Sequence, residues 1–142
     1  RKKTVDLREE LKTVEDYLNL EKIRYEDRLQ YKMETDPASL YCQVPPMMLQ
    51  TLVENGVKHG ISKRIQGGSI NIKTELTDDT LKISIINNGI LETKDSNGIG
   101  LKNTAERLSL LYGVDAHIEI KQITDDEVLV ELSIPLLTKN FI

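Results

Sequence analysis

The sequence predicts an α+β fold in which helices cover one face of a mixed sheet. Segments with helical periodicity alternate with short apolar segments typical of strands, and turn-forming residues join the later strands in pairs. The resulting order of strand, helix, hairpin, helix and hairpin suits a two-layer arrangement. The 142 residues are enough for one domain with one hydrophobic core.

The first predicted element is a helix near the start of the chain. Its apolar residues fall near heptad spacing, with charged residues between them, at Leu7, Leu11, Val14, Leu18 and Tyr25. Such a segment is either the stub of a coiled coil or an amphipathic helix packed on the domain, and the sequence leaves both interpretations open. Short strands are expected over 29–33 and 40–44, around a turn at Asp36-Pro37.

A second helix is predicted to open at Pro45-Pro46, because proline fits the first turn of a helix and not the later ones. It should run to about His59, with Gly60 as its cap. Two strands are expected next, over 69–76 and 81–86, and the strongly apolar composition of 81–86 indicates a central strand.

The last part of the predicted domain begins with a polar loop over 87–98. A third helix starts near Ile99, has apolar residues on one face and ends at Gly113. Two strands, over 116–121 and 128–135, complete the sheet.

Composition excludes several classes of protein. The net charge of -4, with scattered Lys and Arg, argues against a nucleic-acid binder and against a polybasic membrane anchor. The single cysteine, Cys42, excludes an internal disulfide and fits a reducing compartment. There is no apolar run of about 20 residues and no signal peptide. Because the chain opens with Arg1 and has no initial methionine, we expect a piece of a longer protein.

The second predicted helix carries the first candidate site. At 3.6 residues per turn, Glu54, Asn55 and Lys58 share its polar face, while Gly56 lies on the apolar face. A solvated surface is the plain interpretation of such a polar face. Two residues favour a ligand instead, because an interior glycine costs a helix about 1 kcal/mol relative to alanine and asparagine is a weak helix former.

Two further stretches are candidates for ligand binding. At 85–89 an apolar strand ends in two amides and a glycine, which is either a plain turn or a place where a ligand approaches. At 97–103 glycines precede a helix whose N-terminus attracts anions. The glycines do not form a dinucleotide-binding fingerprint, because no strand leads into them, and the chain has no P-loop motif.

In this order the three stretches resemble the N, G1 and G2 boxes of the GHKL ATPase superfamily, which includes gyrase, the heat-shock chaperone, histidine kinases and the mismatch-repair ATPase. The resemblance is closest to the LytS-like branch of sensor histidine kinases. That branch has the pattern Pro-Pro-x-x-Leu-Gln-x-Leu-Val-Glu-Asn-Ala-x-Lys-His-Gly, and residues 45–60 here are Pro-Pro-Met-Met-Leu-Gln-Thr-Leu-Val-Glu-Asn-Gly-Val-Lys-His-Gly. Residues 98–108, 112–113 and 7–29 also resemble it.

The resemblance implies a Bergerat-type α/β sandwich that holds ATP and Mg²⁺ under a lid over 90–97. It divides the chain into the end of a dimerisation or linker helix, 1–28, and an ATP-binding catalytic domain, 29–142. It implies that Asn55 coordinates Mg²⁺ and that Glu54 orients water or the metal. The nucleotide contacts implied by the resemblance are Lys58, His59, Asn87, Gly89, Gly98, Gly100, Leu101, Lys102 and Asn103.

Within that set, the resemblance implies separate tasks for the catalytic, phosphate and base contacts. Lys58 and His59 contact phosphates, and Lys58 counts with Glu54 and Asn55 as catalytic. Asn87 accepts a hydrogen bond from the adenine amine, and Gly89 lets the ring approach. Gly98 and Gly100 shape the phosphate cradle.

Two positions depart from the superfamily pattern. Many members have aspartate where this chain has Asn87. Since an amide carries both an acceptor and a donor and can flip, we expect it to discriminate adenine from guanine less sharply than aspartate would. The superfamily's hydrolases have a glutamate base where this chain has Thr51, four residues before Asn55, which suits a kinase.

The resemblance also implies a reaction and partners. The γ-phosphoryl group of ATP would pass to a histidine on an upstream helix that this chain lacks, since His59 belongs to the pocket and His117 to a strand surface. The partners would be that helix, a response regulator and a second copy in the full-length protein, in the cytoplasmic part of an inner-membrane receptor. Two alternatives remain, an anti-sigma-type serine kinase and an interaction module that binds nucleotide without phosphotransfer.

Overall fold

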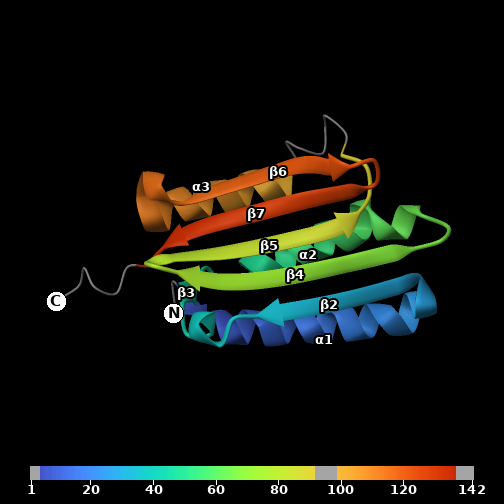
Figure 1. Ribbon diagram of the computed structural model, residues 1–142, viewed down its shortest axis with the longest axis horizontal. Coiled ribbons are helices and arrows are strands. Elements are labelled where there is room, and N and C mark those ends of the chain that lie inside the picture. The colour runs from blue at the N-terminus through green and yellow to red at the C-terminus, as the bar shows by residue number, and fades with distance from the viewer. Residues whose placement is uncertain (1–3, 92–98, 137–142) are drawn as a thin grey trace.

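The computed structural model describes residues 4–91 and 99–136, and its framework is a five-stranded sheet in the order β2-β4-β5-β7-β6 (Figure 1). The bounds are Leu29–Thr35 for β2, Gly68–Thr77 for β4, Thr80–Asn88 for β5, Glu127–Pro135 for β7 and His117–Thr124 for β6. Strands β2 and β4 are parallel, and the other neighbours are antiparallel. The predicted mixed sheet is confirmed, with β5 as its central strand.

Helices α1 (Leu7–Tyr25), α2 (Met48–His59) and α3 (Ile99–Tyr112) lie behind the sheet in the view of Figure 1. Two short strands, β1 (Val5–Asp6) and β3 (Gln43–Val44), pair with each other at one end. Single 3₁₀ turns follow several elements, at Glu26–Arg28, Pro37–Ser39, Ile61–Lys63 and Gly113–Asp115. The predicted α+β fold, with helices on one face, is therefore confirmed.

The core lies between the sheet and the helices, and strand alternation places it there. In β5, Leu81, Ile83 and Ile85 are buried, because successive side chains of a strand point to opposite faces. Helix α1 contributes four apolar residues to the same core, Leu7, Leu11, Val14 and Leu18. Helix α1 is thus an amphipathic helix packed on the domain; that residues 1–28 also belong to a dimerisation helix stays a prediction.

Several predicted boundaries differ from the structure. The expected strand over 40–44 is reduced to Gln43–Val44, because a 3₁₀ turn occupies 37–39. The carboxylate of Asp36 accepts bonds from Leu76 N (2.9 Å) and Ala38 N (3.0 Å), which hold this turn against β4 and lower the pKa of that carboxyl. The polar loop does not begin at residue 87, because β5 continues through Asn88 in register with β7.

Helix α2 begins at Met48 and not at the proline pair. Met47, which precedes it, has a φ of 68°, a left-handed conformation in the turn that leads into the helix. Its side chain provides no cap. The cap comes from α1, where the buried carboxylate of Glu10 accepts hydrogen bonds from Met47 N (2.8 Å) and Leu49 N (3.0 Å).

Two side chains of α3 also donate hydrogen bonds to the segment before α2. The Arg107 guanidinium donates to the carbonyl of Pro46 (2.6 Å), and the Tyr112 hydroxyl donates to the carbonyl of Gln43 (2.8 Å). Burial and the neighbouring thiol of Cys42 raise the pKa of Tyr112 to about 12, so this hydroxyl keeps its proton at neutral pH. The segment before α2 is therefore fixed by side chains of both flanking helices.

The first prediction concerns Glu10. Glu10→Ala is expected to lower the free energy of unfolding by about 2–4 kcal/mol, because one buried and one partly buried N–H group at a helix N-terminus lose their charged acceptor. Urea unfolding followed by circular dichroism measures the change. Glu9→Ala is the control, since Glu9 lies exposed beside it on α1. Equal losses in the two variants would show that the Glu10 cap contributes nothing of its own.

Candidate functional site

Helix α2 presents a polar stripe on the side away from the core, as predicted. Glu54 and Asn55 are half-buried, and Lys58 and His59 are exposed at the C-terminal end. Among the described residues, the side chains of Asn55 and Lys58 make no hydrogen bond or ion pair. The stripe therefore offers an amide and an ammonium group that are available to a ligand.

Glu54 has a partner within its own helix. The amide of Gln50 donates to Glu54 Oε2 (2.9 Å), one turn earlier. Tyr17 of α1 lies near the same carboxylate; burial first, then the negative charges of Glu21 and Glu54, raise its pKa to about 12. Tyr17 is therefore a neutral hydroxyl beside Glu54 at any ordinary pH.

Helix α2 approaches the end of β5 very closely through two glycines. A Cβ atom placed on Gly56 would lie 2.9 Å from Asn87 Oδ1, and one on Gly60 would lie 2.3 Å from the carbonyl oxygen of Asn88. Both distances are shorter than side chains tolerate. Gly60 is the C-cap of the helix, as predicted, although its φ of -109° lies outside the left-handed region that such glycines often adopt. It is a glycine because the strand backbone lies against it.

Asn87 is buried at this junction, with 6% of its surface exposed. Its Nδ2 donates to the carbonyl of Asn88 (2.9 Å). Asn88 points to the other face of the sheet, where its Oδ1 accepts from Ser69 N (2.7 Å). The two consecutive amides thus make different contacts. Asn87 lies against α2, whereas Asn88 forms a hydrogen bond between β5 and β4.

The turn between β6 and β7 holds the chain just after β5. Gly89 N donates to the carbonyl of Asp126 (2.8 Å), and the Gln122 amide donates to the carbonyl of Gly89 (3.0 Å). Leu91 N in turn donates to Gln122 Oε1 (2.7 Å). Gln122 and Asp126 were not found from the sequence, because nothing local marks residues that act 30 or more positions away.

From the sequence, Gly60 was predicted only to cap the helix, and its close contact with β5 was not predicted. A signal was present in the sequence, since Gly56 and Gly60 are four residues apart and so lie on one face of the helix. Two glycines so placed indicate close approach of another backbone, which is what the structure has.

The third predicted stretch lies at the start of α3. Gly100, Leu101, Lys102 and Asn103 fall in the first turns of this helix, and Lys102 is exposed. Helices α2 and α3 contact each other within the helical layer. Gly98 and most of the predicted lid, residues 92–98, lie outside the described residues.

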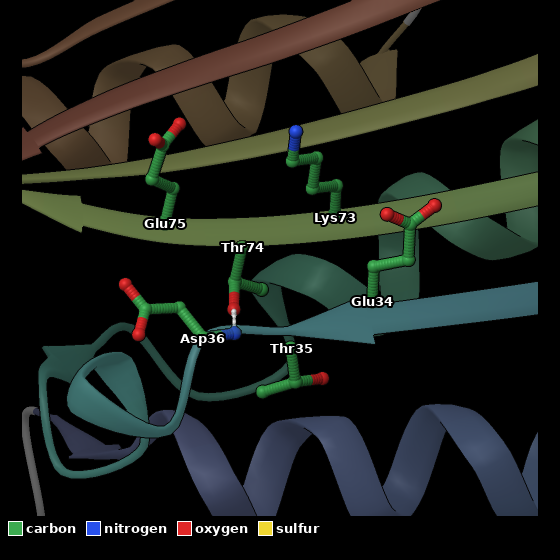
Figure 2. Close-up of a pocket in the computed structure, with 6 residues that line it drawn as sticks. All are labelled: Glu34, Thr35, Asp36, Lys73, Thr74 and Glu75. Atoms are coloured by element: carbon green, nitrogen blue, oxygen red, sulfur yellow. Dashed lines mark hydrogen bonds between the residues drawn. The ribbon is translucent and has the colours of Figure 1, made fainter.

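A hollow on the open face of the sheet is a separate feature (Figure 2). Its lining residues come from the ends of β2 and β4, namely Glu34, Thr35, Asp36, Lys73, Thr74 and Glu75. The strand register pairs Thr74 with Ile83, whereas Asn87 pairs with Ile70. At about 3.3 Å per residue the hollow lies roughly 13 Å along the strand from Asn87, so it does not belong to the candidate site.

The histidines lie where the sequence predicts them. His59 is exposed at the end of α2, and His117 is exposed on β6. Within residues 4–91 and 99–136, no three His, Cys, Asp or Glu side chains come together in a way that could hold a metal ion.

Known proteins resemble this chain in both sequence and structure. No protein-family model matches it. The sensor protein LytS of Staphylococcus saprophyticus is 32% identical over 134 residues, 84% of this chain and 23% of the relative. The sensor histidine kinase YesM of Bacillus subtilis is 28% identical over 141 residues, 95% of this chain and 24% of the relative. The chain thus spans about a quarter of the length of these curated relatives.

Solved structures share the fold. The catalytic domain of the histidine kinase ThkA superposes with a TM-score of 0.71 at 17% identity, covering 94% of this chain and 95% of that chain. The histidine kinase domain of a blue-light activated kinase from Erythrobacter litoralis has a TM-score of 0.69 at 16% identity, covering 96% and 65%. ThkA in complex with the response regulator TrrA has a TM-score of 0.70 at 17% identity, covering 96% and 42%.

The second prediction concerns the glycine contact. Gly60→Ala is expected to lower the free energy of unfolding by about 1–3 kcal/mol, because the new methyl group would overlap the backbone of Asn88 and force α2 and β5 apart. Chemical denaturation measures this. Lys63→Ala, at an exposed position of the following turn, is the control and should change stability by less than about 0.5 kcal/mol. A Gly60→Ala protein as stable as the parent would mean that α2 and β5 are farther apart than the structure has them.

Proposed function

We infer that this chain, a homologue of the LytS and YesM sensor histidine kinases with the fold of a histidine kinase catalytic domain, is an ATP-binding kinase domain that passes the γ-phosphoryl group of ATP to a histidine outside the chain. The observation that carries this is the close approach of α2, the helix that carries the polar stripe, to Asn87 at the end of β5 through Gly56 and Gly60. One end of this junction offers an acceptor to a base, and the other offers an amide and a cation to phosphates.

The residues at the junction fit a nucleotide with Mg²⁺. The Asn55 amide oxygen is a hard ligand with no partner among the described residues, and Mg²⁺ is commonly held by one or two protein oxygens together with substrate phosphates. When bound there, Mg²⁺ would neutralise charge on the phosphates. The donors proposed for the phosphates are Lys58 and His59 at the end of α2 and Lys102 near the start of α3.

The chain's own contribution to phosphoryl transfer would be positioning and charge stabilisation. Lys58 would place its ammonium group against the transferring phosphate. Glu54 would be oriented by its bond to Gln50, toward the metal or a water molecule. Thr51, one turn before Asn55, cannot act as a base toward water, which favours transfer to a protein over hydrolysis.

The partners and location follow from the same proposal. The acceptor histidine would lie on an upstream helix of a full-length dimer. Its phosphoryl group would then pass to a response regulator, the class of partner bound to ThkA in its complex. None of the helices in the described part of the chain is long and apolar enough to cross a membrane. We propose that the domain works on the cytoplasmic side of a receptor in the inner membrane.

The third prediction tests nucleotide binding. Asn55→Ala is expected to weaken binding of ATP in the presence of Mg²⁺ by tenfold or more, about 1.4 kcal/mol, and to reduce the difference between affinities with and without Mg²⁺. Calorimetry on the folded variant measures both. Asn71→Ala is the matched control, since Asn71 is an exposed asparagine on β4. If Asn55→Ala binds as tightly as the control, the stripe of α2 is not the phosphate site.

The fourth prediction concerns the acceptor. Incubated with γ-labelled ATP, the chain should not label itself on histidine, because His59 lies beside the proposed phosphates and His117 is on a strand surface. A supplied upstream helix from the same receptor should become labelled. Acid-labile phosphate on His117 would contradict the proposal. Acid-stable label on serine of a partner would favour the anti-sigma-type kinase, and binding with no transfer to any partner would favour the interaction module.

A further inference from the structure

We propose that Gln122 is a positioning residue for the nucleotide, because its side chain fixes the backbone of Gly89 and Leu91 beside Asn87, where the adenosine half of ATP would bind. The inference rests on the proposed function, since it takes the end of β5 as the base end of the site. Gln122 lies on β6, which β7 separates from β5 in the sheet, and the turn between β6 and β7 lies beside the end of β5 (Figure 1).

A bulge in β6 lies next to Gln122. The pairing of β6 with β7 is regular up to Gln122, opposite Val128, and resumes with Thr124 opposite Glu127, so that Ile123 is an extra residue. A bulge bends its strand and often re-aims a side chain next to a functional site. Here the amide of Gln122 reaches the backbone of the chain that leaves β5, as its hydrogen bonds show.

Both ends of the Gln122 amide bind backbone groups. Its Nε2 donates toward three carbonyl oxygens, those of Gly89 (3.0 Å), Thr124 (2.9 Å) and Glu127 (3.2 Å). Its Oε1 accepts from Leu91 N (2.7 Å). A glutamine amide has donors only on nitrogen and acceptors only on oxygen, and this orientation satisfies both sets of partners. One side chain therefore holds the chain just after β5 at two points.

These bonds fix Gly89 against the proposed base contact. Gly89 N also donates to the carbonyl of Asp126 (2.8 Å), so both polar groups of its backbone are bonded to the β6–β7 hairpin. A Cβ atom placed on Gly89 would lie 3.0 Å from Gly60 Cα and 3.4 Å from Asn87 Nδ2. The backbone held by Gln122 is therefore the backbone that borders Asn87, and losing its bonds would loosen that border.

Gln122 should affect the base end of the proposed site and not its phosphate end. Its hydrogen bonds to described residues all go to the chain after β5 and to the β6–β7 hairpin, whereas the proposed phosphate donors Lys58 and Lys102 are on α2 and α3. Gln122 is also exposed, so its replacement removes no core packing. Loss of its bonds should weaken binding of adenosine and leave binding of a free phosphate chain unchanged, whereas general damage to the fold would weaken both.

The test uses three probes, namely ATP with Mg²⁺ and its two halves, adenosine and inorganic tripolyphosphate. Gln122→Met keeps the length of the side chain and removes its donors and its strong acceptor. The control is Gln30→Met, the same exchange at an exposed position of β2, where the amide donates to the carbonyl of Asp27 (3.2 Å). We expect Gln122→Met to weaken binding of ATP and of adenosine by the same factor, about threefold to tenfold. Tripolyphosphate binding, and every affinity of the control, should stay within about twofold of the parent.

Three results for Gln122→Met would overturn the proposal. They are ATP binding within about twofold of the parent, a loss for ATP without a loss for adenosine, and an equal loss for adenosine and tripolyphosphate. Failure of the proposed function looks different, because the parent chain itself would then bind neither ATP nor adenosine, and this inference would fail with it. If the parent binds both and Gln122→Met binds both equally well, the inference alone is wrong.

A measurement on the parent chain does not depend on the fold of any variant. In a ¹⁵N-labelled protein, the backbone amide proton of Leu91 should exchange with solvent more slowly than in an unfolded chain, because it is bonded to Gln122. Adenosine should slow this exchange further, since a contact that favours a ligand is favoured by that ligand in return, and tripolyphosphate should not. Exchange of Leu91 at the rate of an unfolded chain, or exchange that adenosine leaves unchanged, would overturn the proposal.

Discussion

Helix α2 is held at both ends, and the candidate site depends on that. At its start, a buried carboxylate from α1 binds two backbone N–H groups that the helix cannot satisfy itself. At its end, Gly56 and Gly60 let it lie against the last residues of β5. The first contact sets where the polar stripe begins along the chain, and the second sets its distance from Asn87. A shift of α2 at either end would separate the proposed base contact from the proposed phosphate contacts.

Two departures from the LytS-like pattern meet in space. That pattern has alanine where this chain has Gly56, and many superfamily members have aspartate where it has Asn87. A Cβ at residue 56 would lie 2.9 Å from Asn87 Oδ1. In sequence the two residues are 31 positions apart, and nothing connects them.

The sequence predicted best those elements in which the spacing of apolar residues matches the spacing of buried positions. The apolar faces of α1 and α2 and the alternation in β5 follow from which side chains must leave water, so they can be found without tertiary information. The three candidate stretches were singled out by their glycines and amides, and their part in ligand binding stays a prediction. Boundaries were less accurate where local chemistry competed with pairing. The Asn-Gly pair after Ile86 signals a turn, but pairing with β7 extends the strand through Asn88.

The sequence by itself determined the fold class, the order of the elements and the residues of the polar stripe, because each depends on residue type and spacing along a single element. Tertiary structure alone decided how those elements are joined. The cap on α2 comes from Glu10, 37 residues before Met47, and Gln122 reaches Gly89 from a different strand pair. The direction of the Asn87 amide was decided in the same way. These outcomes depend on which polar groups are left without water when distant segments pack, and a linear pattern carries no record of that.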